Sequence, residues 1–212
     1  MKLQSILALV PAIIASVSAA PATRGTGPDP NQVNFETISY AGSGCPAGTV
    51  SNVASDDKTI LTSVFDQFVA AVGPGLDITS SRKNCQMTLK IHYPGGFQFS
   101  IFEADYRGFV ELEKNVNALQ KSTYYFSGSQ SQASLQTAFA GPKLGDNYLI
   151  SDKLEQASVV WSPCGTEGLL NINAQVQVSK NSSAVTNAAG QLTVDSIDAK
   201  VTQKYSLQWQ KC

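Results

Sequence analysis

Residues 169–179, LLNINAQVQVS, alternate apolar and polar side chains from Leu170 onward. A period of two places the leucine, isoleucine, alanine and valine side chains on one face and the asparagine and glutamine side chains on the other, which is typical of a strand with one buried face. The same period recurs at 85–93, CQMTLKIHY, and at 201–209, VTQKYSLQW, where Gln203 interrupts the apolar row. These three stretches predict strands of a sheet.

Other segments support the same fold class. The stretches STYYFSG at 122–128 and ASVVW at 157–161 are rich in aromatic and β-branched residues, which strands prefer. The PGG sequence at 94–96 predicts a turn before FQFSIF at 97–102, so we expect a β-hairpin there. Strand signals separated by Gly, Pro, Asn and Ser predict an all-β fold, an antiparallel β-sandwich or jelly-roll-like domain.

Two segments fit both a helix and a strand. In TILTSVFDQFVAAVG, residues 59–73, the apolar side chains form a helical stripe, but Leu61 and Phe65 also fit one face of a strand. The stretch VELEKNVNAL at 110–119 presents the same two alternatives. The pattern of these residues favours neither.

The beginning of the chain predicts export. Residues 1–19 combine Lys2 with an apolar run and end in small residues, as secretory signal peptides do, and we expect cleavage after Ala19. Residues 20–34 hold prolines and glycines without apolar periodicity and predict a flexible lead-in. Residues 35–212 then form a single domain, and the mature chain of about 190 residues is long enough for a full core.

The charge of the mature chain excludes several partners. Removal of Lys2 with the signal peptide leaves 14 basic and 16 acidic side chains, a net charge of −2. The basic residues are scattered, so we expect no nucleic acid partner. No later stretch is apolar for long enough to predict membrane insertion.

The four cysteines, Cys45, Cys85, Cys164 and Cys212, predict two disulfides, because their number is even and the protein is exported. Three connectivities are possible, and we favour the one that joins sequence neighbours, Cys45 with Cys85 and Cys164 with Cys212. The spacing matches no zinc motif. A nucleophilic cysteine needs a nearby base and a reducing environment, and this exported chain has a single histidine. We therefore expect Cys164, in WSPCG at 161–165, to form a structural disulfide.

Few residues have the chemistry of a catalytic site. His92 is the only histidine, and without a G-x-S-x-G motif it has no nucleophile to activate; we expect it on a strand surface. Glu103 and Asp105 share a strand face about 7 Å apart, a spacing that glycoside hydrolysis can use. Arg107 continues that face, and a solvated ladder of charges is the favoured interpretation.

The remaining candidates are metal, cofactor and aromatic sites. Asp195 and Asp198, with Asn171 or Asn173 nearby, are weak calcium candidates, but no complete loop pattern is present. We expect no cofactor. The residues Tyr124, Tyr125 and Trp161 are candidates for sugar stacking or protein contact; adjacent tyrosines face opposite sides of a strand, so at most one of the pair joins the core. The sequence NSS at Asn181 predicts an N-glycan.

The chain resembles the fungal secreted proteins of the domain-of-unknown-function 4360 family. The resemblance implies an exported protein with these four cysteines and supports a strand at 59–72, and it carries over no catalytic residue. The matching stretches follow in order along the mature chain: GSGCPAGTV (42–50), FDQFVAAVGPG (65–75), SRKNCQM (81–87), HYPGGFQFSI (92–101), DYRGF (105–109), TYYFSG (123–128), WSPCG (161–165), LNIN (170–173), VDSID (194–198) and LQWQKC (207–212).

These observations favour an extracellular binding module over an enzyme. We expect an effector-like or wall-associated protein, in the cell wall or a host apoplast, that contacts glycan or an extracellular protein. A carbohydrate-active enzyme using Glu103 and Asp105 is the alternative, and a structural wall or spore-coat protein is a third hypothesis.

Overall fold

The computed structural model describes residues 27–193 and 201–212. Strands dominate this described part of the chain, with three one-turn 3-10 helices between them. The elements are η1 (Pro30–Gln32), β1 (Asn34–Ala41), β2 (Val50–Ala54), β3 (Ile60–Phe65), β4 (Ala70–Val72), η2 (Ile78–Ser81), β5 (Arg82–Leu112), β6 (Val116–Phe126), β7 (Gln132–Ala140), β8 (Lys143–Lys153), η3 (Gln156–Ser158), β9 (Gly165–Lys180), β10 (Gly190–Thr193) and β11 (Val201–Lys211).

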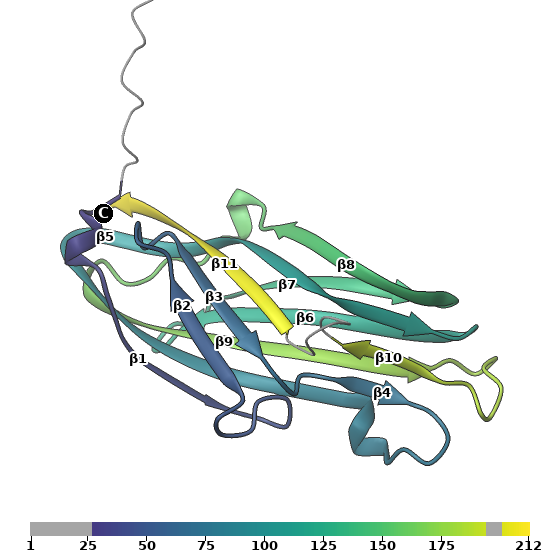
Figure 1. Cartoon of the computed structure of the whole chain (residues 1–212). Helices are drawn as coiled ribbons and strands as arrows, with labels where there is room; N and C mark the ends of the chain where they lie inside the picture. Colours follow the sequence, from purple (N-terminus) through teal and green to yellow (C-terminus); the bar gives the residue numbers. More distant parts are fainter. Residues whose placement is uncertain (1–26, 194–200) are drawn as a thin grey trace, which may run out of the picture.

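The described strands form one continuous hydrogen-bonded sheet that folds at β5 into two layers, which we call the first and the second sheet (Figure 1). All pairs are antiparallel. The first sheet has the order β1–β5–β9–β6–β7 and uses the first half of β5. The second sheet has the order β2–β3–β11–β5–β8 and uses the second half, with β4 and β10 continuing β3 and β11. The predicted β-sandwich architecture is therefore confirmed.

The hairpin predicted across residues 94–96 is wrong. These residues do reverse the chain, but the two halves of β5 enter different sheets, and no described ladder pairs them with each other. The rings of Tyr93 and Phe99 meet at a centroid distance of 5.4 Å on the inner side of the bend. Ser162 Oγ accepts a hydrogen bond from the Phe99 amide at 3.0 Å and closes the bend. Both halves direct their apolar faces inward, which places them in opposing layers.

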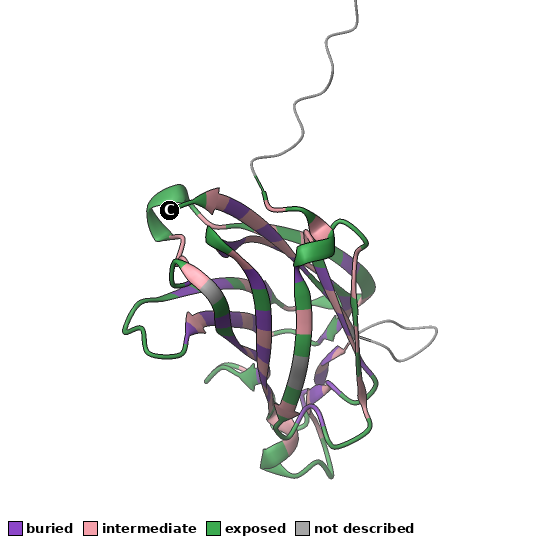
Figure 2. Cartoon of the chain, turned by 90° about the vertical axis from the view of Figure 1, so that its left-hand side faces the viewer, coloured by how far each residue is buried: buried purple, intermediate pink, exposed green. Residues whose placement is uncertain are grey.

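The period-two pattern determines which side chains are buried. Buried and accessible residues alternate along the strands (Figure 2). The polar residues of the same strands face outward, so each sheet has an apolar inner face and a polar outer face. The predicted inward faces of 85–93 and 169–179 are buried as expected: Cys85, Met87, Leu89, Ile91, Tyr93, Leu170, Ile172, Ala174, Val176 and Val178.

A cluster of tyrosines joins the two layers. The hydroxyls of Tyr106 on β5 and Tyr124 on β6 are 3.0 Å apart, and the ring of Tyr205 on β11 packs on Tyr124. Gln203, which interrupts the apolar row of β11, is buried and accepts a hydrogen bond from the Tyr205 hydroxyl. On β8, the Tyr148 hydroxyl donates to a buried glutamine of β6 at 2.9 Å. The polar residue in the β11 pattern is thus a partner for a buried phenol.

The structure resolves the ambiguous segments as strands. Residues 59–73 form β3 and β4, and 110–119 form the end of β5, a turn and the start of β6. The strand expected at 157–161 is wrong, because η3 and irregular chain occupy it. Single hydrogen bonds, rather than a ladder, join this segment to β5. The carbonyl of Val160 accepts from Ser100 Oγ at 2.6 Å, and the Ser162 amide donates to the Phe99 carbonyl at 2.8 Å.

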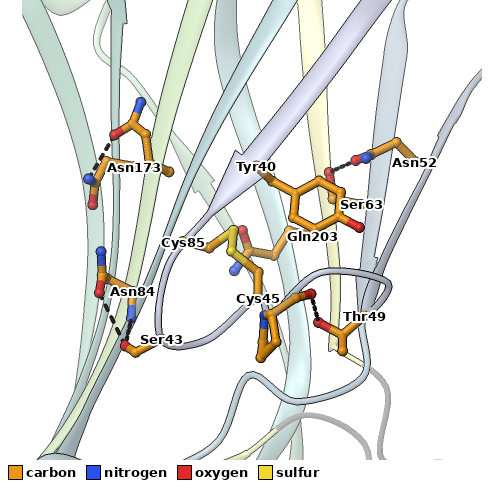
Figure 3. The surroundings of a disulfide bond; sticks show 12 residues. Tyr40, Ser43, Cys45, Thr49, Asn52, Ser63, Asn84, Cys85, Asn173 and Gln203 are labelled. Atoms are coloured by element: carbon orange, nitrogen blue, oxygen red, sulfur yellow. Dashed lines mark hydrogen bonds between the residues drawn. A yellow bond between two sulfur atoms is a disulfide. The ribbon is translucent and has the colours of Figure 1, made fainter.

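Both disulfides have the predicted pairing. Cys45 and Cys85 are bonded with their Cα atoms 5.5 Å apart, and Cys164 and Cys212 with theirs 5.9 Å apart. The first bond ties the loop after β1 to β5 and is buried (Figure 3). The second ties the start of β9 in the first sheet to the end of β11 in the second. Closing loops of this length contributes about 4 kcal/mol each in the chain-entropy estimate.

The glycine before Cys45 is required by close packing. A Cβ atom placed on Gly44 would lie 2.1 Å from the Phe68 ring, which is itself buried against Phe65. The stretch GSGC therefore lets the loop pass over the aromatic side chains and bring Cys45 to Cys85.

The N-terminal expectations lie partly outside the described residues. The signal peptide at 1–19 and the first part of the lead-in fall there. Within the described residues, 30–32 form η1 and Val33 is buried in the core. No helix in the described part of the chain combines the length and the hydropathy needed to span a membrane.

Stability is expected to fall at alkaline pH because of the tyrosine cluster. Burial raises the pKa of Tyr106 to about 12, and it raises the pKa of Tyr124, Tyr205 and Tyr148 as well. Unfolded tyrosine ionises near pH 10, so above that pH the unfolded chain loses protons that the folded chain keeps. The free energy of unfolding should be unaffected by these groups below pH 10. It should then fall by about 1.4 kcal/mol per pH unit for each tyrosine that stays neutral.

Denaturant unfolding at a series of pH values, with ultraviolet absorbance of tyrosinate, measures this effect. The ionisation of the buried tyrosines should coincide with unfolding. Normal titration of all seven tyrosines near pH 10 in a folded protein would contradict the assignment.

Candidate binding surface

The outer face of the first sheet carries an array of amide and hydroxyl side chains. It arises from the polar half of the period-two pattern in the first half of β5, in β9 and in β6, and these strands are neighbours. We call this surface the amide face and define it by Asn84, Gln86, Thr88, Thr123, Tyr125, Asn171, Asn173, Gln175 and Gln177.

Hydrogen bonds between strands hold the centre of the amide face. Asn173 Nδ2 donates to Gln86 Oε1 at 2.9 Å, and Gln86 Nε2 donates to the Tyr125 hydroxyl at 3.3 Å. Next to them, Thr88 Oγ1 donates to Asn171 Oδ1 at 2.8 Å. These residues lie on three adjacent strands and are at most partly exposed. The side chains are therefore fixed in orientation before any ligand arrives, which lowers the entropy cost of binding.

Two shallow grooves meet at one end of the amide face. One has a volume of about 430 Å³ and lies over β6 and β7, with Leu119 and Ala138 in its lining. The other has a volume of about 520 Å³ and lies toward η2, with Ile78 in its lining. Gln177 and Ser179 on β9 line both grooves. The two depressions therefore lie next to each other, on either side of β9.

Charged groups lie at the opposite end of the face. Lys90 pairs with Glu36 at 2.9 Å and with Glu167 at 3.0 Å. The hydrogen bonds that Lys90 donates to these two carboxylates raise its pKa. His92 is exposed beside them, opposite Glu167 in the ladder. The charges at this end largely compensate one another. Two basic residues lie beside Gln175 toward the other end of the face: Lys121 is its ladder partner, and Arg82 donates a hydrogen bond to its Oε1 at 2.7 Å. The hydrogen-bonded groups around Gln86, between the two ends, are neutral.

The catalytic candidates do not converge. Glu103, Asp105 and Arg107 alternate with the buried Ala104 and Tyr106, so they lie on the outer face of the second sheet. His92 lies on the outer face of the first sheet. The four residues that the sequence offers as candidate acids, bases and charge partners therefore form no common site.

The two carboxylates do share one partner. Ser151 Oγ lies 2.8 Å from Glu103 Oε1 and 2.5 Å from Asp105 Oδ1, and Lys153 Nζ lies 3.3 Å from Glu103. A hydroxyl has one proton and donates to only one carboxylate at a time. A groove of about 400 Å³ beside them is lined by Asp105, Arg107 and Lys204. The arrangement is a mixed-charge surface ladder with one hydroxyl at its centre.

The aromatic candidates have three different positions. Tyr124 is 3 % exposed and bonded inside the core, so it is not available to an external ligand. Tyr125 belongs to the amide face. Trp161 is half-buried in the irregular segment between η3 and β9, away from the amide face. Of the two adjacent tyrosines, one is inside and one outside, as the alternation predicts.

The metal and modification candidates are only partly described. Asp195 and Asp198 lie outside the described residues. In residues 27–193 and 201–212, no group of three or more His, Cys, Asp or Glu side chains is placed to hold a metal ion. Asn181 is exposed at the end of β9, with its Oδ1 accepting a hydrogen bond from the Ser183 amide at 2.9 Å.

The sequence predicts the strands of the amide face but not the surface that they form together. The signal was present in Asn171, Asn173, Gln175 and Gln177, an uninterrupted run of amides on one face of a strand. What was missing was the pairing of β9 with β5 and β6, which brings further amides and Tyr125 next to this run.

Comparisons with known proteins give one family and one homologue of high similarity. The model of a family described as "Domain of unknown function (DUF4360)" matches residues 31–212. An uncharacterized secreted protein of Arthroderma benhamiae is 50% identical over 188 residues, which is 89% of this chain and 75% of the relative. Among solved structures, TmCBM61 in complex with beta-1,4-galactotriose matches with a TM-score of 0.27 and 11% identity, over 90% of this chain and 100% of the other.

Proposed function

The chain belongs to the DUF4360 family, and for this member we propose that it binds a neutral glycan chain outside the cell through its amide face. The protein is secreted, as its relative is, and its two disulfides suit an oxidising environment. The observation that carries the proposal is the ordered row of amides around Tyr125 on three adjacent strands.

The chemistry of the amide face matches that of sugar hydroxyls. Each asparagine or glutamine presents one acceptor oxygen and two donor hydrogens, and each sugar hydroxyl is both a donor and an acceptor. Tyr125 adds a partly exposed ring on which the apolar side of a pyranose can stack. Polar groups that fix orientation around an aromatic surface are a common arrangement in small-molecule sites.

The hydrogen-bonded group of Gln86, Asn173 and Tyr125 carries no charge, and this favours a neutral ligand. The nearest ion pairs, Lys90 with Glu36 and Glu167, lie at one end and satisfy each other. The grooves on either side of Gln177 and Ser179 lie next to each other, which suits an extended chain rather than a single sugar. The centre also lacks the clustered tryptophan, tyrosine and arginine anchors that dominate protein–protein interfaces, since Tyr125 is its single aromatic residue.

Removal of Tyr125 or Gln86 should weaken glycan binding without unfolding the protein. We expect Tyr125→Ala and Gln86→Ala each to raise the Kd about tenfold, equivalent to about 1.4 kcal/mol of lost contact. Both side chains face solvent, so the melting temperature should change little. A glycan array identifies the ligand, and calorimetric titration with that ligand measures the Kd.

Thr202→Ala, on the outer face of the second sheet, is the matched control and should bind as the wild type does. Equal binding by all three variants would place the site elsewhere. Failure of the wild type to bind any neutral glycan, together with binding of a purified extracellular protein, would overturn the proposal in favour of a protein ligand.

A second candidate function is carbohydrate hydrolysis by Glu103 and Asp105. The observation in its favour is that both carboxylates lie within hydrogen-bond distance of the same Ser151 hydroxyl, which places them close together on one strand face. Paired carboxylates are the usual machinery of glycoside hydrolysis. The ion pair of Glu103 with Lys153 and its place on an open sheet face instead suit a solvated charge ladder.

Glu103→Gln tests this second candidate. If the protein is a binding module, the wild type and Glu103→Gln should both release no product from polysaccharide substrates, and both should bind the array ligand equally. Product release by the wild type that the substitution lowers by a hundredfold or more would establish catalysis. Reducing-sugar release over a panel of wall polysaccharides is the measurement.

We also propose that Asn181 carries an N-glycan. Its side chain is exposed at a turn where the backbone amide of Asn181 is held by the carbonyl of Asn115 at 3.0 Å. Asn181→Gln should lower the mass of the secreted protein by the mass of one glycan, and endoglycosidase treatment of the wild type should give the same shift. An unchanged mass in both experiments would refute the modification.

A further inference from the structure

The groove between the β4–η2 segment and the end of β9 has an apolar wall that is open to solvent (Figure 1). Of the side chains in its lining, Ile78 is 81 % exposed, Leu76 is 50 % exposed and Val72 is half-buried. The groove volume of about 520 Å³ lies within the range of about 300–1,000 Å³ that is usual for small-molecule sites. Apolar side chains that gather in one groove, rather than being scattered singly, indicate a surface that another group covers.

This apolar wall is held in place by hydrogen bonds around η2. Asp77 Oδ1 accepts a hydrogen bond from the Thr79 amide at 2.8 Å, at the start of the turn. Ser81 Oγ donates to the Ile78 carbonyl at 2.6 Å and closes the turn at its other end. The exposed Ile78 side chain is therefore presented from a fixed backbone, and covering it needs no ordering of this segment.

The opposite wall of the groove is the end of β9, and the strand pairing continues from there to the glycosylation sequon. The last described pair of β9 with β6 is Lys180 with Val116. One residue further, the Asn181 amide donates to the Asn115 carbonyl at 3.0 Å, so the pairing includes Asn181. Successive side chains of a strand alternate in direction, so Asn181 points to the same face as Ser179, which lines the groove about 7 Å away.

The turn that carries Asn181 leaves the atom that bears an N-glycan unoccupied by protein. Asn181 Oδ1 accepts a hydrogen bond from the Ser183 amide at 2.9 Å, and Asn115 Nδ2 donates to the Ser183 carbonyl at 2.9 Å. The sugar is attached through Nδ2, and no hydrogen bond of Asn181 Nδ2 is present among the described residues. Attachment therefore keeps the bond that orients the side chain, and the glycan starts from a fixed turn at the edge of the groove.

We propose that the N-glycan of Asn181 folds back into this groove and packs its first two N-acetylglucosamine residues against Leu76 and Ile78. The inference rests on the glycan proposed above for Asn181. The apolar side of each sugar ring and the methyl of each acetamide cover the apolar wall, which removes its surface from water. The sugar hydroxyls bind the Gln177 amide and the Ser179 hydroxyl in the same groove.

Covalent attachment favours this occupant over a free molecule. A group tethered beside its site has an effective concentration in the millimolar range, so weak contacts are enough to keep it there. The attached glycan therefore covers the end of the amide face next to η2. An external glycan is left with the centre around Tyr125 and with the groove over β6 and β7.

Cleavage of the native secreted protein by an endoglycosidase that cuts between the first two N-acetylglucosamine residues tests the proposal. The groove should protect this bond, so the native wild type should be cleaved at least tenfold more slowly than the reduced and alkylated chain. Ile78→Ser removes the most exposed part of the apolar wall and no core contact, so it should fold normally and lose most of the protection. Mass spectrometry of timed samples measures the rates.

Hydrogen exchange gives an independent readout of the same contact. Complete removal of the glycan with an amidase should increase exchange of the backbone amides of residues 76–81 several-fold. The amides of residues 143–147, at the start of β8 and outside the groove, serve as the internal reference and should be unchanged.

Two control variants show whether the effect belongs to this groove. Leu144→Ser removes an even more exposed apolar side chain outside the groove and should be cleaved as the wild type is. Tyr125→Ala should keep full protection even where it weakens binding of an external glycan, so failure at the amide face is distinguishable from failure here. Absence of a glycan on Asn181, equal cleavage of native and unfolded wild type, or full protection in Ile78→Ser would overturn the assignment.

Discussion

The reversal of β5 places the two halves of this strand in opposing layers. At the bend the rings of Tyr93 and Phe99 are in contact, and this contact joins the first half of β5 to the second. Both rings pack on Trp209 of β11, and the Ser162 hydroxyl bonds to the residues on either side of the bend. Because β5 is an internal strand of both sheets, its bend determines how the layers face each other. The Cys164–Cys212 bond then joins β9 and β11 across the layers.

Strand pairing around β5 determines the surfaces as well as the core. The register that buries Met87 opposite Ile172 also places Gln86 opposite Asn173 on the outside. The same ladder that makes the apolar interior therefore assembles the amide face. On the second sheet, the corresponding outward positions of β5 carry Glu103 and Asp105, so the two faces have different chemistry although they share a strand.

The period-two pattern was sufficient to predict the all-β fold and which faces are buried, because both depend on neighbouring residues. Pairing the cysteines as sequence neighbours was also correct, since each bond closes a loop between adjacent parts of the fold. The hairpin at 94–96 was wrong because a tight turn can join strands within one layer or between two, and only the packing of Tyr93 on Phe99 distinguishes these outcomes. The amide face was missed for a related reason: Gln86 and Asn173 are 87 residues apart and meet only through the sheet.

A surface built from carboxamides does not titrate. Carboxylates and imidazoles change their charge, and so their donors and acceptors, when the surroundings acidify, whereas asparagine and glutamine side chains keep the same hydrogen-bonding capacity. The hydrogen bonds from Asn173 to Gln86 and from Gln86 to Tyr125 should therefore persist at acidic pH as they do at neutral pH. The hydrogen-bonding capacity of these amide side chains is therefore independent of pH in the acidic range.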